Sequence, residues 1–205
     1  MTNATRRALD LAALLLLLAA CGTKAPVLPA LAAGDVVLAF GDSLTFGTGA
    51  NESESYPAIL ASLIGRSVIR EGVPGETTEQ GLERLPQALE MHHPRLVLLC
   101  LGGNDMLRKV DEATTEANLR QMVQTVRASG AALVLIGVPR PALFAGTAPL
   151  YLNIAKDLQV PLERTILADV LHDNALKSDA IHPNAAGYRK VAEAIAALLR
   201  AAGAV

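Results

Sequence analysis

The chain has 205 residues, enough for one domain whose core needs no disulfide or metal staples. Apolar residues make up 51% of it and aromatic residues 3%, tryptophan is absent, and 18 Lys and Arg nearly balance 20 Asp and Glu. No basic run appears, so we expect no nucleic-acid partner, because phosphate binding needs clustered Lys and Arg.

The N-terminus has the pattern of an export signal. Two arginines precede an apolar run, 11–20, which has the length of a secretory h-region and is too short to span a bilayer comfortably. Small residues before Cys21 resemble a bacterial lipobox. We expect a signal peptide over 1–20, a lipidated N-terminus and tether over 21–34, and a membrane anchor in the bacterial envelope, facing the periplasm. The alternative is an ordinary signal peptide with an incidental cysteine after it.

After the tether, short apolar runs alternate with segments of helical periodicity. β-Branched and aliphatic runs predict strands at 36–40, 67–69, 96–101, 132–138 and 166–169. Apolar spacings of three and four residues, with helix-start signals, predict helices at 56–64, 78–90, 112–129, 149–158 and 184–202. Strands separated by helices pair in parallel, and near-continuous apolar strands fit a sheet covered on both faces. We expect one α/β domain over 35–205, a three-layer α/β/α sandwich with about five parallel strands.

Three residues have the chemistry of a serine hydrolase. Ser43 follows the first strand in Gly-Asp-Ser-Leu, where its hydroxyl would be exposed at the sheet edge. His182 lies three residues after Asp179, so in a turn the carboxylate can accept from Nδ1 and leave Nε2 to face the serine. A serine needs such a base, and the imidazole needs such an acceptor. Taken alone, the serine could equally be a helix N-cap.

Two further residues are candidates for an oxyanion hole, which acyl transfer requires. Asn104, after two glycines, offers a side-chain amide, and Gly75 offers a backbone N–H with no side chain in the way. Both residue types also favour turns, and for Gly75 alone turn chemistry is the better explanation.

Four segments, in order, resemble the four blocks of the SGNH hydrolase superfamily, also called the GDSL family: 41–44, 74–77, 102–105 and 179–183. The resemblance covers nearly all of the chain after the tether and is closest to the thioesterase I / lysophospholipase L1 / arylesterase branch. It implies a flavodoxin-like fold, with Ser43 as nucleophile, His182 as base and Asp179 as the orienting carboxylate. It also implies an oxyanion hole made of the N–H groups of Ser43 and Gly75 and the amide of Asn104. No metal or organic cofactor is implied.

The chain departs from the family pattern at three places. Arg70-Glu71 stands where Asn-Ala is typical of the branch. Glu76 stands where the family usually has Asp, and Arg140 places a cation where the branch has an apolar residue near the acyl groove, which puts a preference for long acyl chains in doubt. Candidates for the acyl-binding wall, for each of which core packing is an equally good explanation, are Met106, Leu107, Pro141 and Leu143.

Together these features predict a serine esterase that hydrolyses a small acyl ester or thioester through an acyl-enzyme, and we expect a monomer. One alternative is a carbohydrate O-acetylesterase of the cell envelope on the same fold. Another is an envelope lipoprotein that binds a ligand without turning it over. Cys100 lies inside a buried apolar run, so we interpret it as a free thiol that packs as a small hydrophobe.

Overall fold

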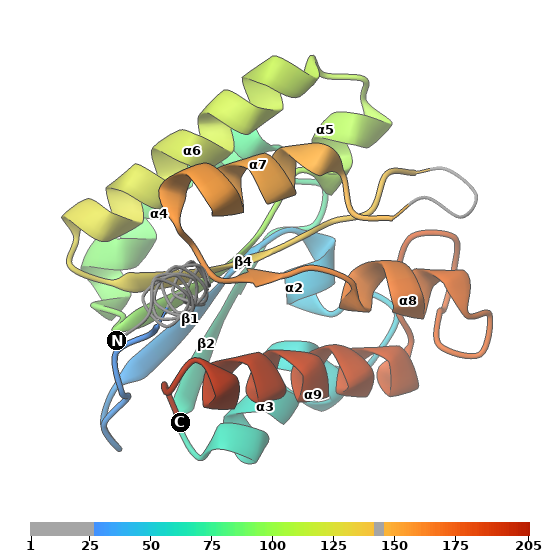
Figure 1. Cartoon of the computed structure of the whole chain (residues 1–205). Helices are drawn as coiled ribbons and strands as arrows, with labels where there is room; N and C mark the ends of the chain where they lie inside the picture. Colours follow the sequence, from blue (N-terminus) through green and yellow to red (C-terminus); the bar gives the residue numbers. More distant parts are fainter. Residues whose placement is uncertain (1–26, 142–145) are drawn as a thin grey trace, which may run out of the picture.

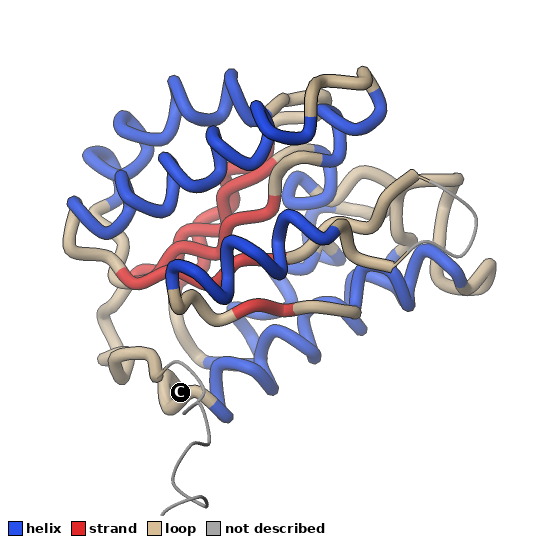
Figure 2. Tube along the Cα trace, turned by 45° about the horizontal axis from the view of Figure 1, so that its top comes forward, coloured by secondary structure: helices blue, strands red, loops and turns tan. Residues whose placement is uncertain are grey.

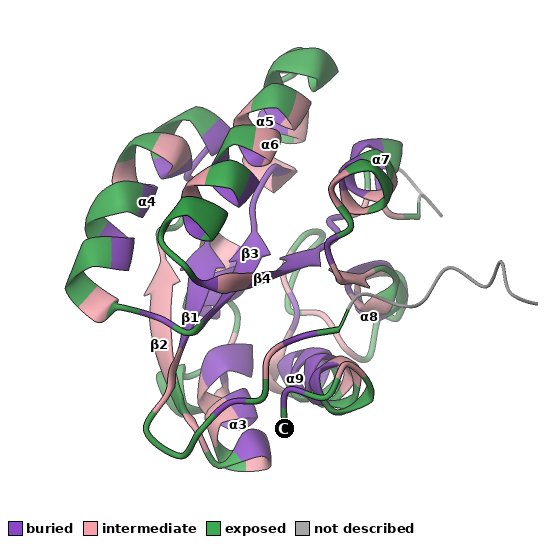
Figure 3. Ribbon diagram, turned by 60° about the vertical axis from the view of Figure 1, so that its left-hand side comes forward, coloured by how far each residue is buried: buried purple, intermediate pink, exposed green. Residues whose placement is uncertain are grey.

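The computed structural model describes residues 27–141 and 146–205, and its centre is a five-stranded parallel sheet of order β2-β1-β3-β4-β5 (Figure 1). The strands are β1 (Val36–Gly41), β2 (Ser67–Gly72), β3 (Leu96–Cys100), β4 (Ala132–Ile136) and β5 (Leu162–Glu163). All residues of β3, and all but the first of β1, are buried, as expected for strands covered on both faces. Figure 3 shows these strands in the buried colour.

Helices form a layer on each face of the sheet, as the tube in Figure 2 shows. One layer contains α4 (Thr78–His92), α6 (Glu112–Ala128) and α7 (Pro149–Leu158), and the other contains α3 (Tyr56–Ile64) and α9 (Ala185–Ala201). Their buried residues face the sheet and their exposed residues face solvent. The predicted three-layer α/β/α sandwich is therefore confirmed.

The fifth strand and the segment after it differ from the prediction. The predicted strand at 166–169 lies in a helix, α8 (Ile166–His172), and the fifth strand is the two-residue β5. The Glu163 carboxylate accepts the Ile166 N–H at 3.0 Å and so satisfies an N–H at the start of the helix. A short apolar run has the same composition in a buried strand and in a buried helix, so periodicity could not distinguish the two.

Short elements in the connections that follow β1 and β3 were not predicted. These are α2 (Ser43–Phe46), the 3-10 turn η1 (Glu52–Glu54) and α5 (Gly103–Leu107). Each is too short to contain a readable apolar period, yet α2 carries the candidate Ser43, and α5 carries Asn104, Met106 and Leu107.

The packed domain begins earlier than the boundary expected at residue 35. Leu28 and Leu31 are buried in the main core, and their N–H groups donate to the carbonyls of Ala202 and Ala204 at 3.0 and 2.8 Å. The apolar side chains explain this docking, because leaving them in water would cost free energy. The predicted signal peptide and Cys21 lie outside the described residues. Within residues 27–141 and 146–205, no helix has the length and apolar character to cross a membrane.

The thiol of Cys100, at the end of β3, is buried and free, as predicted. Burial raises the pKa of this thiol well above its ordinary value. It therefore packs as a small apolar group at neutral pH.

Candidate active site

Ser43 lies just beyond the carboxyl end of β1. It follows a sharp turn and is the first residue of α2. Asp42 caps α2, since its carboxylate accepts the Leu44 N–H at 2.9 Å. A Cβ on Gly41 would lie 2.2 Å from the Cys100 carbonyl oxygen, so only glycine lets the chain turn this close to β3. The turn leaves the Ser43 hydroxyl in a cavity at the sheet edge.

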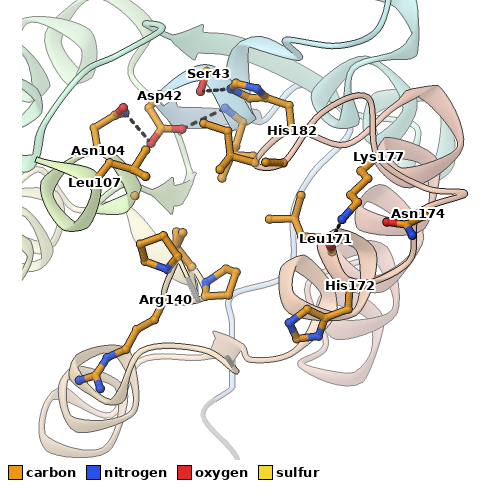
Figure 4. Close-up of a pocket in the computed structure, with 17 residues that line it drawn as sticks. Asp42, Ser43, Asn104, Leu107, Arg140, Leu171, His172, Asn174, Lys177 and His182 are labelled. Atoms are coloured by element: carbon orange, nitrogen blue, oxygen red, sulfur yellow. Dashed lines mark hydrogen bonds between the residues drawn. The ribbon is translucent and has the colours of Figure 1, made fainter. Parts of the chain in front are cut away.

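His182 reaches Ser43 across the domain. Its Nε2 lies 2.9 Å from Ser43 Oγ, although the two residues are 139 positions apart (Figure 4). The other imidazole nitrogen, Nδ1, lies 2.8 Å from Asp179 Oδ2. Since a carboxylate can only accept, the proton of a neutral imidazole belongs on Nδ1, and Nε2 then accepts from the serine hydroxyl. The predicted proximity of these three side chains is confirmed.

Asp179 is held by the loop that carries His182. Its Oδ1 accepts the N–H groups of Ile181 and His182 at 2.8 and 2.9 Å. Partial desolvation raises the pKa of Asp179, but the hydrogen bonds from Ile181 and His182 outweigh it and hold the pKa below the ordinary value of 3.8. The carboxylate is therefore ionised at neutral pH and can stabilise an imidazolium.

Asn104 lies in α5, directly after β3, and its side-chain amide joins two loops. Nδ2 donates to the Glu76 carbonyl at 3.0 Å and to Asp42 Oδ2 at 3.2 Å. Gly75 precedes Glu76 and has a φ of 81°, a conformation that favours glycine. The structure thus brings Asn104 beside the neighbours of both Ser43 and Gly75, as the sequence predicted for residues of one site.

Asp42 is a buried carboxyl group next to the serine, and sequence reasoning did not single it out. Burial raises its pKa to about 7, and the nearby carboxylates of Glu76 and Asp105 add to the shift, while the Leu44 N–H opposes it. The sequence indicates only that Asp42 belongs to a turn. Its desolvation follows from the packing of β3 and α5 against it.

A cavity of about 540 Å³ opens beside Ser43 and His182. Leu107 and Pro141 line it, as predicted, and so does Arg140. The guanidinium of Arg140 points away from Ser43 in Figure 4 and lies 2.8 Å from Glu112 Oε2.

The other two predicted wall residues do not contribute to the described lining. Met106 packs against the core and borders a separate hollow. Consecutive residues of a helix point about 100° apart, so of Met106 and Leu107 only Leu107 faces the cavity. Leu143 lies outside the described residues. Lining residues that the sequence did not suggest include Val138, Leu171 and Ile181. Ile181 could have been suspected, since it precedes His182.

Among the described residues, no cluster of three or more His, Cys, Asp or Glu side chains is arranged to hold a metal ion.

The model of the GDSL-like lipase/acylhydrolase family matches residues 39–190, a range that contains all four predicted blocks. The chain belongs to this family. Among bacterial relatives of this GDSL-like hydrolase, thioesterase 1/protease 1/lysophospholipase L1 of Escherichia coli K12 is 38% identical over 161 residues, 75% of this chain and 77% of the relative. The arylesterase of Vibrio mimicus is 32% identical over 175 residues, 80% of this chain and 88% of the relative.

Solved structures agree with these relatives. The crystal structure of TesA matches the GDSL-like hydrolase with a TM-score of 0.72 and 28% identity, and the match covers 82% of this chain and 99% of that chain. The family and these relatives make the chain an ester-bond hydrolase of the serine esterase type.

Proposed function

We propose that the chain hydrolyses carboxylic esters or thioesters through an acyl-enzyme on Ser43. Ser43 Oγ attacks the acyl carbonyl while His182 Nε2 accepts its proton, and His182 then protonates the departing alcohol or thiol. Water, deprotonated by His182, attacks the acyl-enzyme, and His182 returns that proton to Ser43 Oγ as the bond to the acyl group breaks and the acid leaves. The observation that carries the proposal is the 2.9 Å distance between Ser43 Oγ and His182 Nε2, with Asp179 at 2.8 Å on the far side of the ring.

The proposed oxyanion hole consists of the N–H groups of Ser43 and Gly75 and the amide of Asn104. The two hydrogen bonds of Asn104 Nδ2 support this grouping, because one reaches Glu76, next to Gly75, and the other reaches Asp42, next to Ser43. Both hydrogens of the amide are donated to protein oxygens here. Binding the oxyanion therefore requires Asn104 to exchange one protein acceptor for the substrate oxygen, a rearrangement that substrate binding commonly brings about.

The acyl group of the substrate is proposed to occupy the cavity beside Ser43. Its apolar lining by Leu107, Pro141, Leu171 and Ile181 supports an acyl chain longer than acetyl. The pairing of Arg140 with Glu112 supports this further, since the cation has its own partner and points away from the serine. The names of the relatives, a thioesterase/lysophospholipase and an arylesterase, agree with an acyl ester or thioester substrate.

The test of the proposal is Ser43→Ala, with Ser62→Ala as the matched control. Ser62 is an exposed serine on α3, remote from the cavity. Hydrolysis of p-nitrophenyl butyrate should disappear in the first variant and remain unchanged in the second. Turnover by a folded Ser43→Ala protein at the rate of the parent would refute the assignment.

We also propose that the protein is exported and lipidated at Cys21 in the bacterial envelope, and the sequence pattern at residues 11–21 supports this. Intact-mass analysis of the full chain expressed in a Gram-negative host should find Cys21 as the acylated first residue. The Cys21→Ser protein should lack the lipid mass. A mature protein without lipid, or with another first residue, would contradict the anchor and leave the esterase proposal untouched.

A further inference from the structure

Arg84, on α4, binds the loop that carries Gly75. Arg84 Nε and Nη2 lie 2.7 and 2.8 Å from the two carboxylate oxygens of Glu76, a bidentate pair. The same guanidinium donates to Glu71 twice, from Nη1 to Oε2 at 2.9 Å and from Nη2 to the backbone carbonyl at 3.2 Å. One side chain therefore joins the end of β2, the loop after it and α4.

The Arg84–Glu76 pair is largely buried, so it is favourable only while its hydrogen bonds keep good geometry. The Glu76 side chain is 4% exposed and the Arg84 side chain 22% exposed. The guanidinium also stacks over the Phe40 ring, 4.0 Å from its centroid. Planar Arg can satisfy both oxygens of a buried carboxylate and lie flat on a ring, whereas the point charge of Lys cannot do both.

The backbone of Glu76 connects this pair to the proposed oxyanion hole. The Glu76 carbonyl accepts Asn104 Nδ2 at 3.0 Å, and the residue before Glu76 is Gly75, whose N–H is another proposed donor. Two of the three proposed donors thus depend on where Glu76 lies. The third, the Ser43 N–H, belongs to α2 and does not.

We propose that Arg84 is a positioning residue for acyl transfer, which holds the Gly75 and Asn104 donors in place through Glu76. The inference rests on the proposed function. Because a donor displaced by about 1 Å can lower the rate of a reaction about a hundredfold, loosening this loop should affect turnover more than substrate binding.

The experiment compares Arg84→Lys with Arg120→Lys. Arg120 is a matched control, because it also contacts two carboxylates, Glu116 and Asp157, with a side chain 29% exposed, but it joins α6 to α7 away from the cavity. With p-nitrophenyl butyrate, Arg84→Lys should lower kcat about ten- to a hundredfold with little change in KM. Arg120→Lys should leave both constants unchanged.

Two further measurements separate positioning from loss of stability. A boronic acid that forms a tetrahedral adduct with Ser43 should bind Arg84→Lys more weakly by the same factor as kcat falls. Asn104→Ala, which removes one proposed donor outright, should lose about 10²- to 10³-fold in kcat and sets the upper limit. If Arg84→Lys does not fold, Glu76→Gln replaces it, with the same expected fall in kcat.

A folded Arg84→Lys or Glu76→Gln protein with the kcat of Arg120→Lys would overturn the inference. That outcome differs from failure of the proposed function, in which the parent protein itself would lack Ser43-dependent hydrolysis.

Discussion

Asp42, the residue before Ser43, combines two roles. Its carboxyl caps α2 through the Leu44 N–H and accepts the Asn104 amide, yet it is 2% exposed. An ionised carboxylate in such a place is costly, which is why its pKa rises from 3.8 to about 7. The protonation state of the Asp42 carboxyl therefore affects the stability of the fold.

Replacing Asp42 by Asn should change how stability depends on pH. The unfolded chain releases the Asp42 proton near pH 4, whereas the folded protein holds it until about pH 7. Titration of Asp42 therefore lowers the unfolding free energy of the wild-type protein as the pH rises from 4 to 7, and has no further effect above pH 7. Asn does not titrate. The unfolding free energy of Asp42→Asn minus that of the wild type should therefore increase from pH 4 to 7 and then level off. Urea unfolding at several pH values measures this difference, and a difference independent of pH would contradict the buried, protonated carboxyl.

The sequence could predict residues whose chemistry is local or follows a known block. Asp179 and His182 are three positions apart, and Ser43 stands in a recognisable tetrapeptide. The sequence could therefore predict that these three side chains lie together, and in the structure they do. The burial of Asp42 and the pairing of Arg84 with Glu76 could not be proposed in this way. Both arise from packing between elements that are distant in the sequence, and composition carries no signal of that packing.

The helix α8 forms part of the wall of the cavity beside Ser43. A strand at 166–169, as predicted, would have continued the sheet, whereas the helix puts Leu171 in the wall of the cavity, below His182 in Figure 4. Longer elements, such as α4, α6 and β3, were predictable, because they contain several apolar periods or a continuous buried run. The short elements that shape the site were not, since their conformation follows from caps and turns.

Leu171→Trp should narrow the cavity and shift the preference for acyl length. We expect kcat/KM for p-nitrophenyl octanoate to fall about tenfold relative to that for the acetate, because a long chain loses buried methylene contacts worth about 0.8 kcal/mol each. Leu198→Trp is the control, a partly buried leucine near the far end of α9. If the octanoate-to-acetate ratio were the same in both variants, the acyl chain would not occupy this cavity.

In the domain, Ser43 and Leu28 lie at opposite ends of the sheet. The helix α9 begins beside the loop of His182 and runs 17 residues, about 25 Å, to the end where Leu28 docks on Ala202. An anchor attached through Cys21 would therefore hold the end of the domain that is remote from Ser43. The full-length protein with the lipid proposed at Cys21 and its Cys21→Ser form should accordingly hydrolyse a water-soluble ester with equal kcat/KM, and a large difference between them would argue against this arrangement.

Every step of the proposed hydrolysis depends on Ser43 being a nucleophile activated by His182. Incubation of the folded protein with a p-nitrophenyl alkylphosphonate, followed by intact-mass analysis and peptide mapping, tests this directly. We predict one phosphonyl group per chain, attached to Ser43 Oγ with release of p-nitrophenolate, and a much slower reaction in His182→Ala. Absence of label on Ser43 in the folded wild-type protein, or an undiminished rate in His182→Ala, would contradict a serine nucleophile activated by His182.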